Sequence, residues 1–158
     1  MTIYLDKEMR KGLREWLSAH HFKATIRKEN GGSWSCIPDK KQIYVPTTDS
    51  TDFNAELMSW FRDHNYTADF DIITLSFLHE LGHCITRTTD LELNRLLLLE
   101  KYNSDTLFNS LPDSEKNRLY WDIPFEAAAN EWAINFCEKH PAAAQRLENI
   151  LASCIKNV

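Results

Sequence analysis

The chain has 158 residues, 43% of them hydrophobic and 26% charged, and its formal net charge is -5. These values are typical of one soluble globular domain that buries its own core. The acidic balance and the lack of a basic run argue against a nucleic-acid partner and an anionic-lipid surface, and no segment is apolar for long enough to be a membrane span.

The N-terminal segment and the cysteines predict a cytoplasmic protein. The start, MTIYLDKEMRKGL, has charged residues from Asp6 onward, so it lacks the apolar stretch of a secretory signal. The four cysteines, Cys36, Cys84, Cys137 and Cys154, are widely spaced. This spacing is typical of buried thiols in a reducing compartment rather than of a disulfide framework.

The first part of the chain predicts a helix, a small sheet and a second helix. Asp6 is placed to cap a helix that ends near His20. Alternating residues from Phe22, and the segments 34–37 and 42–45 with turns between them, predict an antiparallel sheet of about three strands. A helix is expected next, for which the candidate caps are Ser50, Thr51 and Asp52. Its apolar face is formed by Phe53, Leu57, Trp60 and Phe61.

The rest of the chain is expected to be helical. The segment 69–86 is apolar on nearly every side, which predicts a buried central helix. The segment 91–101 carries six leucines, which either complete the core, the favoured interpretation, or form a surface for a partner. A short helix is expected over 113–119, and Pro124 opens a longer one.

A last helix is expected to begin at Pro141, with an apolar face formed by Ala143, Leu147, Ile150, Leu151, Cys154 and Ile155. The elements together predict one α+β domain over residues 1–158, with the small sheet near the N-terminus and the helices behind it.

Residues 79–83, with the sequence HELGH, carry the chemistry. His79 and His83 are four residues apart, so both imidazoles lie on one helical face and can bind one zinc ion. Glu80 lies about 100° round the helix from His79, where it can face a metal-bound water without binding the metal. Three ionisable side chains are costly in a buried helix unless they share a purpose, so we predict one Zn²⁺ per chain.

An open zinc site needs a third protein ligand, for which the candidates are Cys84, Glu92, Glu126, Glu131, Cys137 and His140. Glu126 is preferred because Asn130 follows it by four residues, where an amide can hydrogen-bond a ligating histidine, although a simple polar position at the rim explains Asn130 equally well. The alanines at 127–129 allow this helix to approach the histidines closely. Cys137 lies three turns from Glu126, about 16 Å along a helix, which is too far for the same ion. The predicted ligands are His79, His83 and Glu126.

These two segments, HELGH at 79–83 and EAAANEWA at 126–133, resemble the gluzincin metallopeptidases, and most closely the ImmA/IrrE-type peptidases and the minigluzincins. The resemblance implies a zincin-like fold, a zinc ion, and a peptide or protein substrate. It also implies that the metal activates a water near neutral pH, and that Glu80 accepts the proton and returns it to the leaving amine.

Two roles stay open at this point. Tyr102, Tyr120 and His140 are all candidates for a group that stabilises the oxyanion. The segment 42–45 is the candidate edge strand along which a substrate would lie, although edge protection by Lys40, Lys41 and Pro46 explains the same residues.

The leading hypothesis is therefore a cytoplasmic zinc metalloendopeptidase with Glu80 as the general base. The alternative is a latent or degenerate zinc-binding domain that acts through protein–protein interaction. A DNA-binding regulator would need a basic recognition helix, which the sequence does not contain. The sequence leaves the oligomeric state open.

Overall fold

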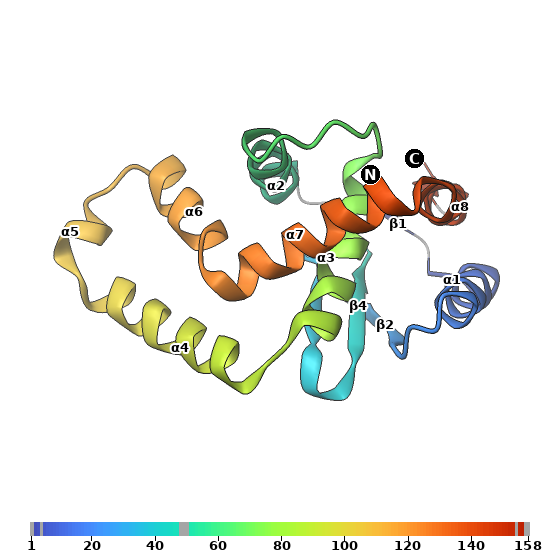
Figure 1. The fold of residues 1–158 in the computed structure, drawn as a ribbon, viewed down its shortest axis with the longest axis horizontal. Helices are drawn as coiled ribbons and strands as arrows, with labels where there is room; N and C mark the ends of the chain where they lie inside the picture. Colours follow the sequence, from blue (N-terminus) through green and yellow to red (C-terminus); the bar gives the residue numbers. More distant parts are fainter. Residues whose placement is uncertain (1, 4, 48–50, 154, 157–158) are drawn as a thin grey trace.

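The chain is an α+β protein in which helices surround one buried helix and a small sheet (Figure 1). The computed structural model describes residues 2–3, 5–47, 51–153 and 155–156. The helices are α1 (Lys7–Ala19), α2 (Thr51–Asp63), α3 (Ile72–Thr86), α4 (Thr89–Ser104), α5 (Thr106–Asn109), α6 (Asp113–Trp121), α7 (Pro124–Lys139) and α8 (Pro141–Ala152). The strands are β1 (Thr2–Ile3), β2 (Thr25–Glu29), β3 (Ser35–Ile37), β4 (Gln42–Pro46) and β5 (Ile155–Lys156), with a 3₁₀ turn, η1 (Pro38–Lys40), between β3 and β4.

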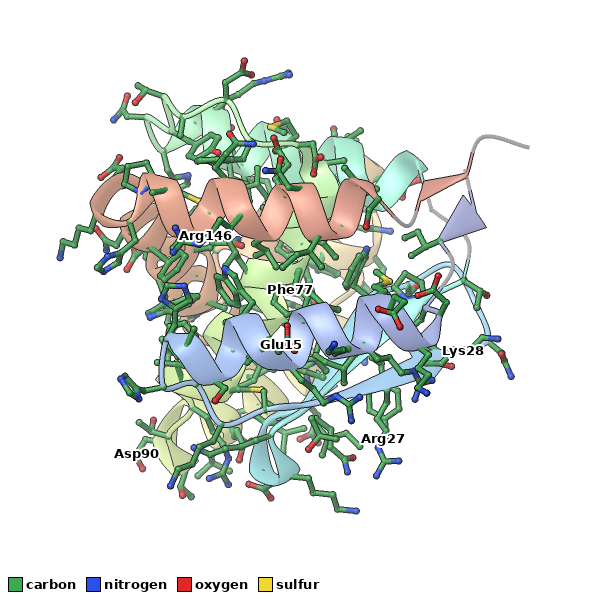
Figure 2. All side chains as sticks on the ribbon, turned by 90° about the vertical axis from the view of Figure 1, so that its right-hand side faces the viewer. Glu15, Arg27, Lys28, Phe77, Asp90 and Arg146 are labelled. Carbon is green, nitrogen blue, oxygen red and sulfur yellow. The ribbon has the colours of Figure 1, made fainter. Side chains whose placement is uncertain are left out.

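The first helix is confirmed. Asp6 caps α1 by accepting a hydrogen bond from the backbone N–H of Met9 at 2.8 Å. The apolar face of α1 is buried, and Trp16 donates its indole N–H to the carbonyl oxygen of Ala143 on α8 at 2.9 Å. Figure 2 shows α1 and α8 side by side, with Phe77 of α3 beneath them. The two ends of the chain therefore cover the same part of the core.

The sheet is mixed, so the prediction of an antiparallel sheet is wrong for one of its strand pairs. The strand order is β2-β4-β3, in which β2 pairs with β4 in parallel and β3 pairs with β4 antiparallel. β4 is the central strand because it buries Ile43, Val45 and Pro46, whereas β2 buries only Ile26. Residues 30–34 carry the chain from one edge of the sheet to the other. Their turn signal is the same as that of a hairpin, so the sequence alone suggested the simpler pairing.

The buried central helix is confirmed as α3. Every residue from Ile73 to Cys84 is buried, and Asp71 caps the helix by accepting the backbone N–H of Thr74 at 2.8 Å. The sheet, α2, α7 and α8 all pack against α3. A polar side chain on α3 is therefore removed from water on whichever face it lies, and it needs a partner inside the protein.

The backbones of α3 and α7 touch at Gly82. A Cβ atom on Gly82 would lie 2.6 Å from the carbonyl oxygen of Ala129 and 3.0 Å from its Cα atom. Both are backbone atoms, so they could move only if α7 itself shifted. The expectation that small residues bring these two helices together is confirmed, and Gly82 on α3 is one of them, facing Ala129 on α7.

The expectation that the leucines of 91–101 complete the core is wrong. No residue of α4 is buried, and Leu93, Leu96 and Leu97 are 55%, 60% and 57% exposed. Figure 1 shows α4, α5 and α6 as an arch that leaves the body after α3 and returns at the start of α7. A helix that packs mainly against α7 and α5 keeps part of its circumference in solvent. In the described part of the chain, neither α4 nor any other helix has the length and apolar character to cross a membrane.

The chain ends differ in part from the prediction. The last helix, α8, ends at Ala152, and Ile155 belongs to β5, which pairs antiparallel with β1. The second predicted helix is confirmed as α2, with Leu57, Trp60 and Phe61 buried. Outside the described residues lie Ser50 and Cys154, and the side chains of Thr51, Asp52 and Phe53 are likewise not described.

We expect Gly82→Ala to lower the free energy of unfolding by about 1–3 kcal/mol, the usual cost of overpacking a core. Gly31→Ala is the matched control, because a Cβ atom on Gly31 meets nothing within 4 Å. Urea unfolding of the two variants and the parent measures both changes. Equal effects at the two glycines would contradict the close contact between α3 and α7.

Candidate metal centre

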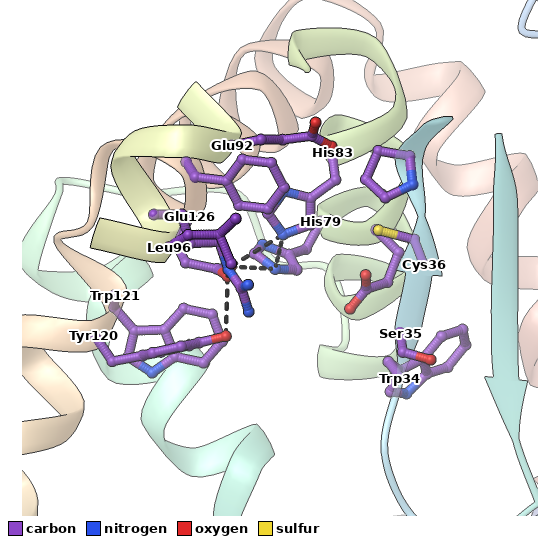
Figure 3. A pocket seen from close by; sticks show the side chains of 14 residues that line it. Trp34, Ser35, Cys36, His79, His83, Glu92, Leu96, Tyr120, Trp121 and Glu126 are labelled. Carbon is purple, nitrogen blue, oxygen red and sulfur yellow. Dashed lines mark hydrogen bonds and ion pairs between the residues drawn. The ribbon is translucent and has the colours of Figure 1, made fainter. Parts of the chain in front are cut away.

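Three side chains from α3 and α7 meet at one point in the core. The Nε2 atoms of His79 and His83 are 3.0 Å apart, and Oε2 of Glu126 lies 3.2 Å from the first and 3.0 Å from the second (Figure 3). A tetrahedral zinc ion with bonds of about 2.0–2.1 Å holds its ligand atoms about 3.3 Å apart. The three donor atoms therefore form a triangle close to the size of one face of such a site, and the group could hold a metal ion.

The electrostatics of this cluster favour a cation. Burial by itself lowers the pKa of His79, but its hydrogen bond to Glu126 and the charges of Glu80 and Glu126 outweigh burial and raise that pKa. Burial by itself raises the pKa of Glu126, but the hydrogen bonds from both imidazoles hold it well below its usual range. The carboxylate is therefore ionised and attracts either a proton on His79 or a metal ion.

Asn130 orients the first histidine. Nδ1 of His79 donates a hydrogen bond to Oδ1 of Asn130 at 2.6 Å, and Asn130 is fully buried one turn beyond Glu126 on α7. With its proton on Nδ1, His79 turns the lone pair of Nε2 toward the other two donor atoms. The spacing of Glu126 and Asn130 predicted this contact.

Packing orients the second histidine. The ring of His83 stacks on Phe125 with 4.3 Å between ring centroids and an interplanar angle of 20°. Within the described part of the chain, Nδ1 of His83 has no hydrogen-bond partner. Trp121 packs edge to face with His79, at 5.4 Å between ring centroids. Aromatic residues at the ends of α6 and α7 thus restrain both imidazoles.

The other carboxylate oxygen of Glu126 has its own partners. Tyr120 donates its hydroxyl to Oε1 of Glu126 at 2.9 Å, and burial with the nearby carboxylate raises the pKa of Tyr120. Tyr120 therefore keeps its proton at neutral pH. Nε of Arg95, on α4, lies 3.5 Å from the same oxygen. Sequence reasoning missed Arg95, and the only signal was one cation within a run of leucines.

The cluster opens into a cavity of about 350 Å³. Glu80 is buried and reaches the same cavity from α3, while Trp34, Ser35 and Cys36 form the opposite wall (Figure 3). Contact with the Cys84 thiol, burial and the nearby Glu80 carboxylate raise the pKa of Cys36. Cys36 is therefore a neutral thiol beside Glu80.

The strand beside the cavity is not the one that the sequence favoured. Residues 42–45 belong to β4, which is the central strand of the sheet, so they do not form an edge. The edge strand that lines the cavity is β3, through Ser35 and Cys36. The Pro and Lys residues around the turn suggested edge protection on β4, but β2 covers that side.

The remaining ligand candidates lie away from the donor atoms. Glu92 lines the cavity but accepts a hydrogen bond from Nε of Arg87 at 2.9 Å. Cys84 lies beside Cys36, and Cys137 is buried near Tyr66. Glu131 and His140 are exposed. Only Glu126 of these candidates joins the two histidines.

The three candidates for the group that stabilises the oxyanion lie in different parts of the structure. Tyr102 stacks on Phe108 in the arch, with 4.5 Å between centroids, and His140 packs on Phe136 at the far end of α7, at 5.2 Å. Tyr120 lines the cavity and touches Glu126. It is the one of the three that lies beside the cluster.

No protein-family model matches the chain, and neither a curated protein nor a solved structure matches it. The assignment of the site depends on its own geometry and chemistry.

We expect the protein to bind one Zn²⁺ per chain, and His83→Ala or Glu126→Gln to weaken binding by at least a hundredfold, because each removes one of three protein ligands. Glu92→Gln is the matched control, since Glu92 lines the same cavity without reaching the donor atoms. Competition with a chromogenic chelator measures the affinities. Parent-like zinc affinity in Glu126→Gln would contradict the ligand set.

Zinc affinity should fall as the pH is lowered, by up to about tenfold per unit, because the metal and a proton compete for His79. The pKa of His79 in the metal-free protein is raised above 6.5 by Glu126 and Glu80, with His83 and Asn130 also facing it. The loss should therefore begin above pH 6.5. Chelator competition between pH 8 and pH 5.5 measures it, and an affinity that stays constant down to pH 6 would refute this prediction.

Proposed function

We propose that the protein is a zinc-dependent metallopeptidase with a zincin-like fold, which hydrolyses peptide bonds with Glu80 as the general base. The observation that carries this proposal is the position of Glu80. It is buried beside two histidines that share one metal-sized cluster with Glu126, it lines the same cavity, and it is not one of the three clustered donors. A structural metal site would have no need of a second buried carboxylate at its open side.

Each residue around the cluster then has its own role in the proposed reaction. A zinc ion bound here would supply positive charge and lower the pKa of its water to about 7. Glu80 would accept the proton of that water and pass it to the leaving amine. Asn130 keeps His79 in the tautomer that turns Nε2 toward the metal. Tyr120 lies in the cavity with a protonated hydroxyl and is the best placed of the three candidates to donate to the oxyanion, for which it would release its hydrogen bond to Glu126.

The edge of the sheet supports a peptide as the substrate. β3 is an edge strand, and its residues Ser35 and Cys36 line the cavity across from the cluster. An extended peptide that paired with this edge would run past Glu80 and the metal ligands. This arrangement favours a chain with repeating backbone groups over a small compact substrate.

One observation favours the alternative, a latent zinc-binding domain that acts through a protein partner. The exposed leucines of α4 form an apolar helix surface that such a partner could cover. The intact Glu80 in an open cavity argues for the enzyme.

Glu80→Gln should lower peptide cleavage at least a hundredfold and leave the zinc content unchanged, because a general base typically contributes about 10²–10⁴-fold. The measurement is turnover of a diverse peptide pool by zinc-loaded parent and variant, with Glu92→Gln as the control within the same cavity. An active, zinc-loaded Glu80→Gln protein would refute the assignment of Glu80. Zinc binding without cleavage by the parent would favour the latent domain.

A further inference from the structure

The cavity contains one cation whose charge the proposed reaction does not use. Among the described residues that line it, the charged groups outside the clustered donors are Glu80, Glu92 and Arg95. Glu92 is paired with Arg87, which lies outside the lining. Arg95 is therefore the only guanidinium that faces the cavity in the described part of the chain, and its side chain is 32% exposed, so a solute can reach it.

Arg95 is held in place by Phe125, Tyr120 and Glu126. Its guanidinium lies over the ring of Phe125, with Cζ 5.5 Å from the ring centroid. Nε lies 3.5 Å from Oε1 of Glu126, yet it has no hydrogen-bond partner among the described residues. Tyr120 makes the short contact with that oxygen instead, at 2.9 Å. The rest of the guanidinium is reached by solvent, since the side chain is 32% exposed, so an acceptor from outside the chain can bind its outer N–H groups.

The charge balance points to an anion as that acceptor. Glu126 directs Oε2 toward the histidines, so its negative charge is shared with whatever cation binds there. The carboxylate of Glu126 therefore neutralises the charge of Arg95 only in part. The planar guanidinium binds carboxylates through paired N–H donors, with a geometry that lysine does not offer.

We propose, on the basis of the metallopeptidase function above, that Arg95 binds a carboxylate of the peptide substrate next to the scissile bond. The carboxylate belongs either to an acidic side chain or to a free C-terminus. Arg95 is thus a specificity residue. Because its Nε lies 3.5 Å from the carboxylate that joins the histidines, a group bound to Arg95 lies near the proposed metal and so near the bond to be cut.

A purely positioning role for Arg95 makes a different prediction. If Arg95 only held Glu126 in place, its loss would weaken zinc binding and would affect acidic and neutral peptides equally. Carboxylate recognition instead predicts a loss that depends on the peptide.

The test uses zinc-loaded Glu80→Gln protein, so that peptides bind without being cut. Acetylated tetrapeptides are compared as matched pairs, Glu against Gln in the side chain, and free carboxylate against amide at the C-terminus. Calorimetry measures peptide binding to the Glu80→Gln protein. It is repeated with double variants, in which Glu80→Gln is combined with Arg95→Gln, Arg95→Lys or the control Lys101→Gln. Lys101 is exposed, lies on the same helix and does not line the cavity.

At least one acidic form should bind about tenfold or more tightly than its neutral partner, as expected for a charge-assisted hydrogen bond. The pair that shows the difference identifies the source of the carboxylate. Arg95→Gln should abolish the difference, Arg95→Lys should retain part of it, and Lys101→Gln should retain all of it.

Three results would overturn the inference. The first is equal binding of the acidic and neutral peptides. The second is a preference for acidic peptides that persists in Arg95→Gln, because it would then come from the metal alone. The third is loss of zinc from Arg95→Gln under conditions that saturate the parent. This binding test needs no turnover. If the parent fails to cleave any peptide, the proposed function fails while the test of Arg95 still gives an answer.

Discussion

The close contact between α3 and α7 is the constraint on which the site depends. Gly82 lies between the two histidines in the sequence, and its missing side chain lets the backbone at Ala129 approach α3. That approach brings Glu126 and Asn130, which flank Ala129 on α7, over His79 and His83. A larger residue at 82 would separate the two halves of the cluster. The same residue thus serves packing and chemistry.

The sequence predicts well which side chains share a helix face, because that information is local. Four-residue spacing on a helix fixes which side chains share a face, so His79 with His83, and Glu126 with Asn130, follow from periodicity alone. The cap at Asp6 and the buried helix α3 follow in the same way. The structure adds the distances between the donor atoms, which cannot be derived from the spacing of residues in the sequence.

The sequence predicts less well what depends on contacts between distant segments. Strand order is an example, because the short connection at 30–34 resembles a hairpin turn between β2 and β3, whereas β2 pairs with β4, which follows β3 along the chain. The leucines of α4 are another, because their number indicates burial, while the arch leaves no layer to cover them. Arg95 belongs to this arch, so its place beside Glu126 could not be read from its neighbours in the chain.

We propose that His79, His83 and Glu126 hold a zinc ion whose fourth position is open. X-ray absorption spectroscopy of the zinc-loaded protein distinguishes this ligand set from others, because it counts the ligands and separates sulfur from lighter atoms. We expect four nitrogen or oxygen ligands at about 2.0–2.2 Å, including two imidazoles. A sulfur ligand at about 2.3 Å, contributed by Cys36 or Cys84 beside Glu80, would contradict it.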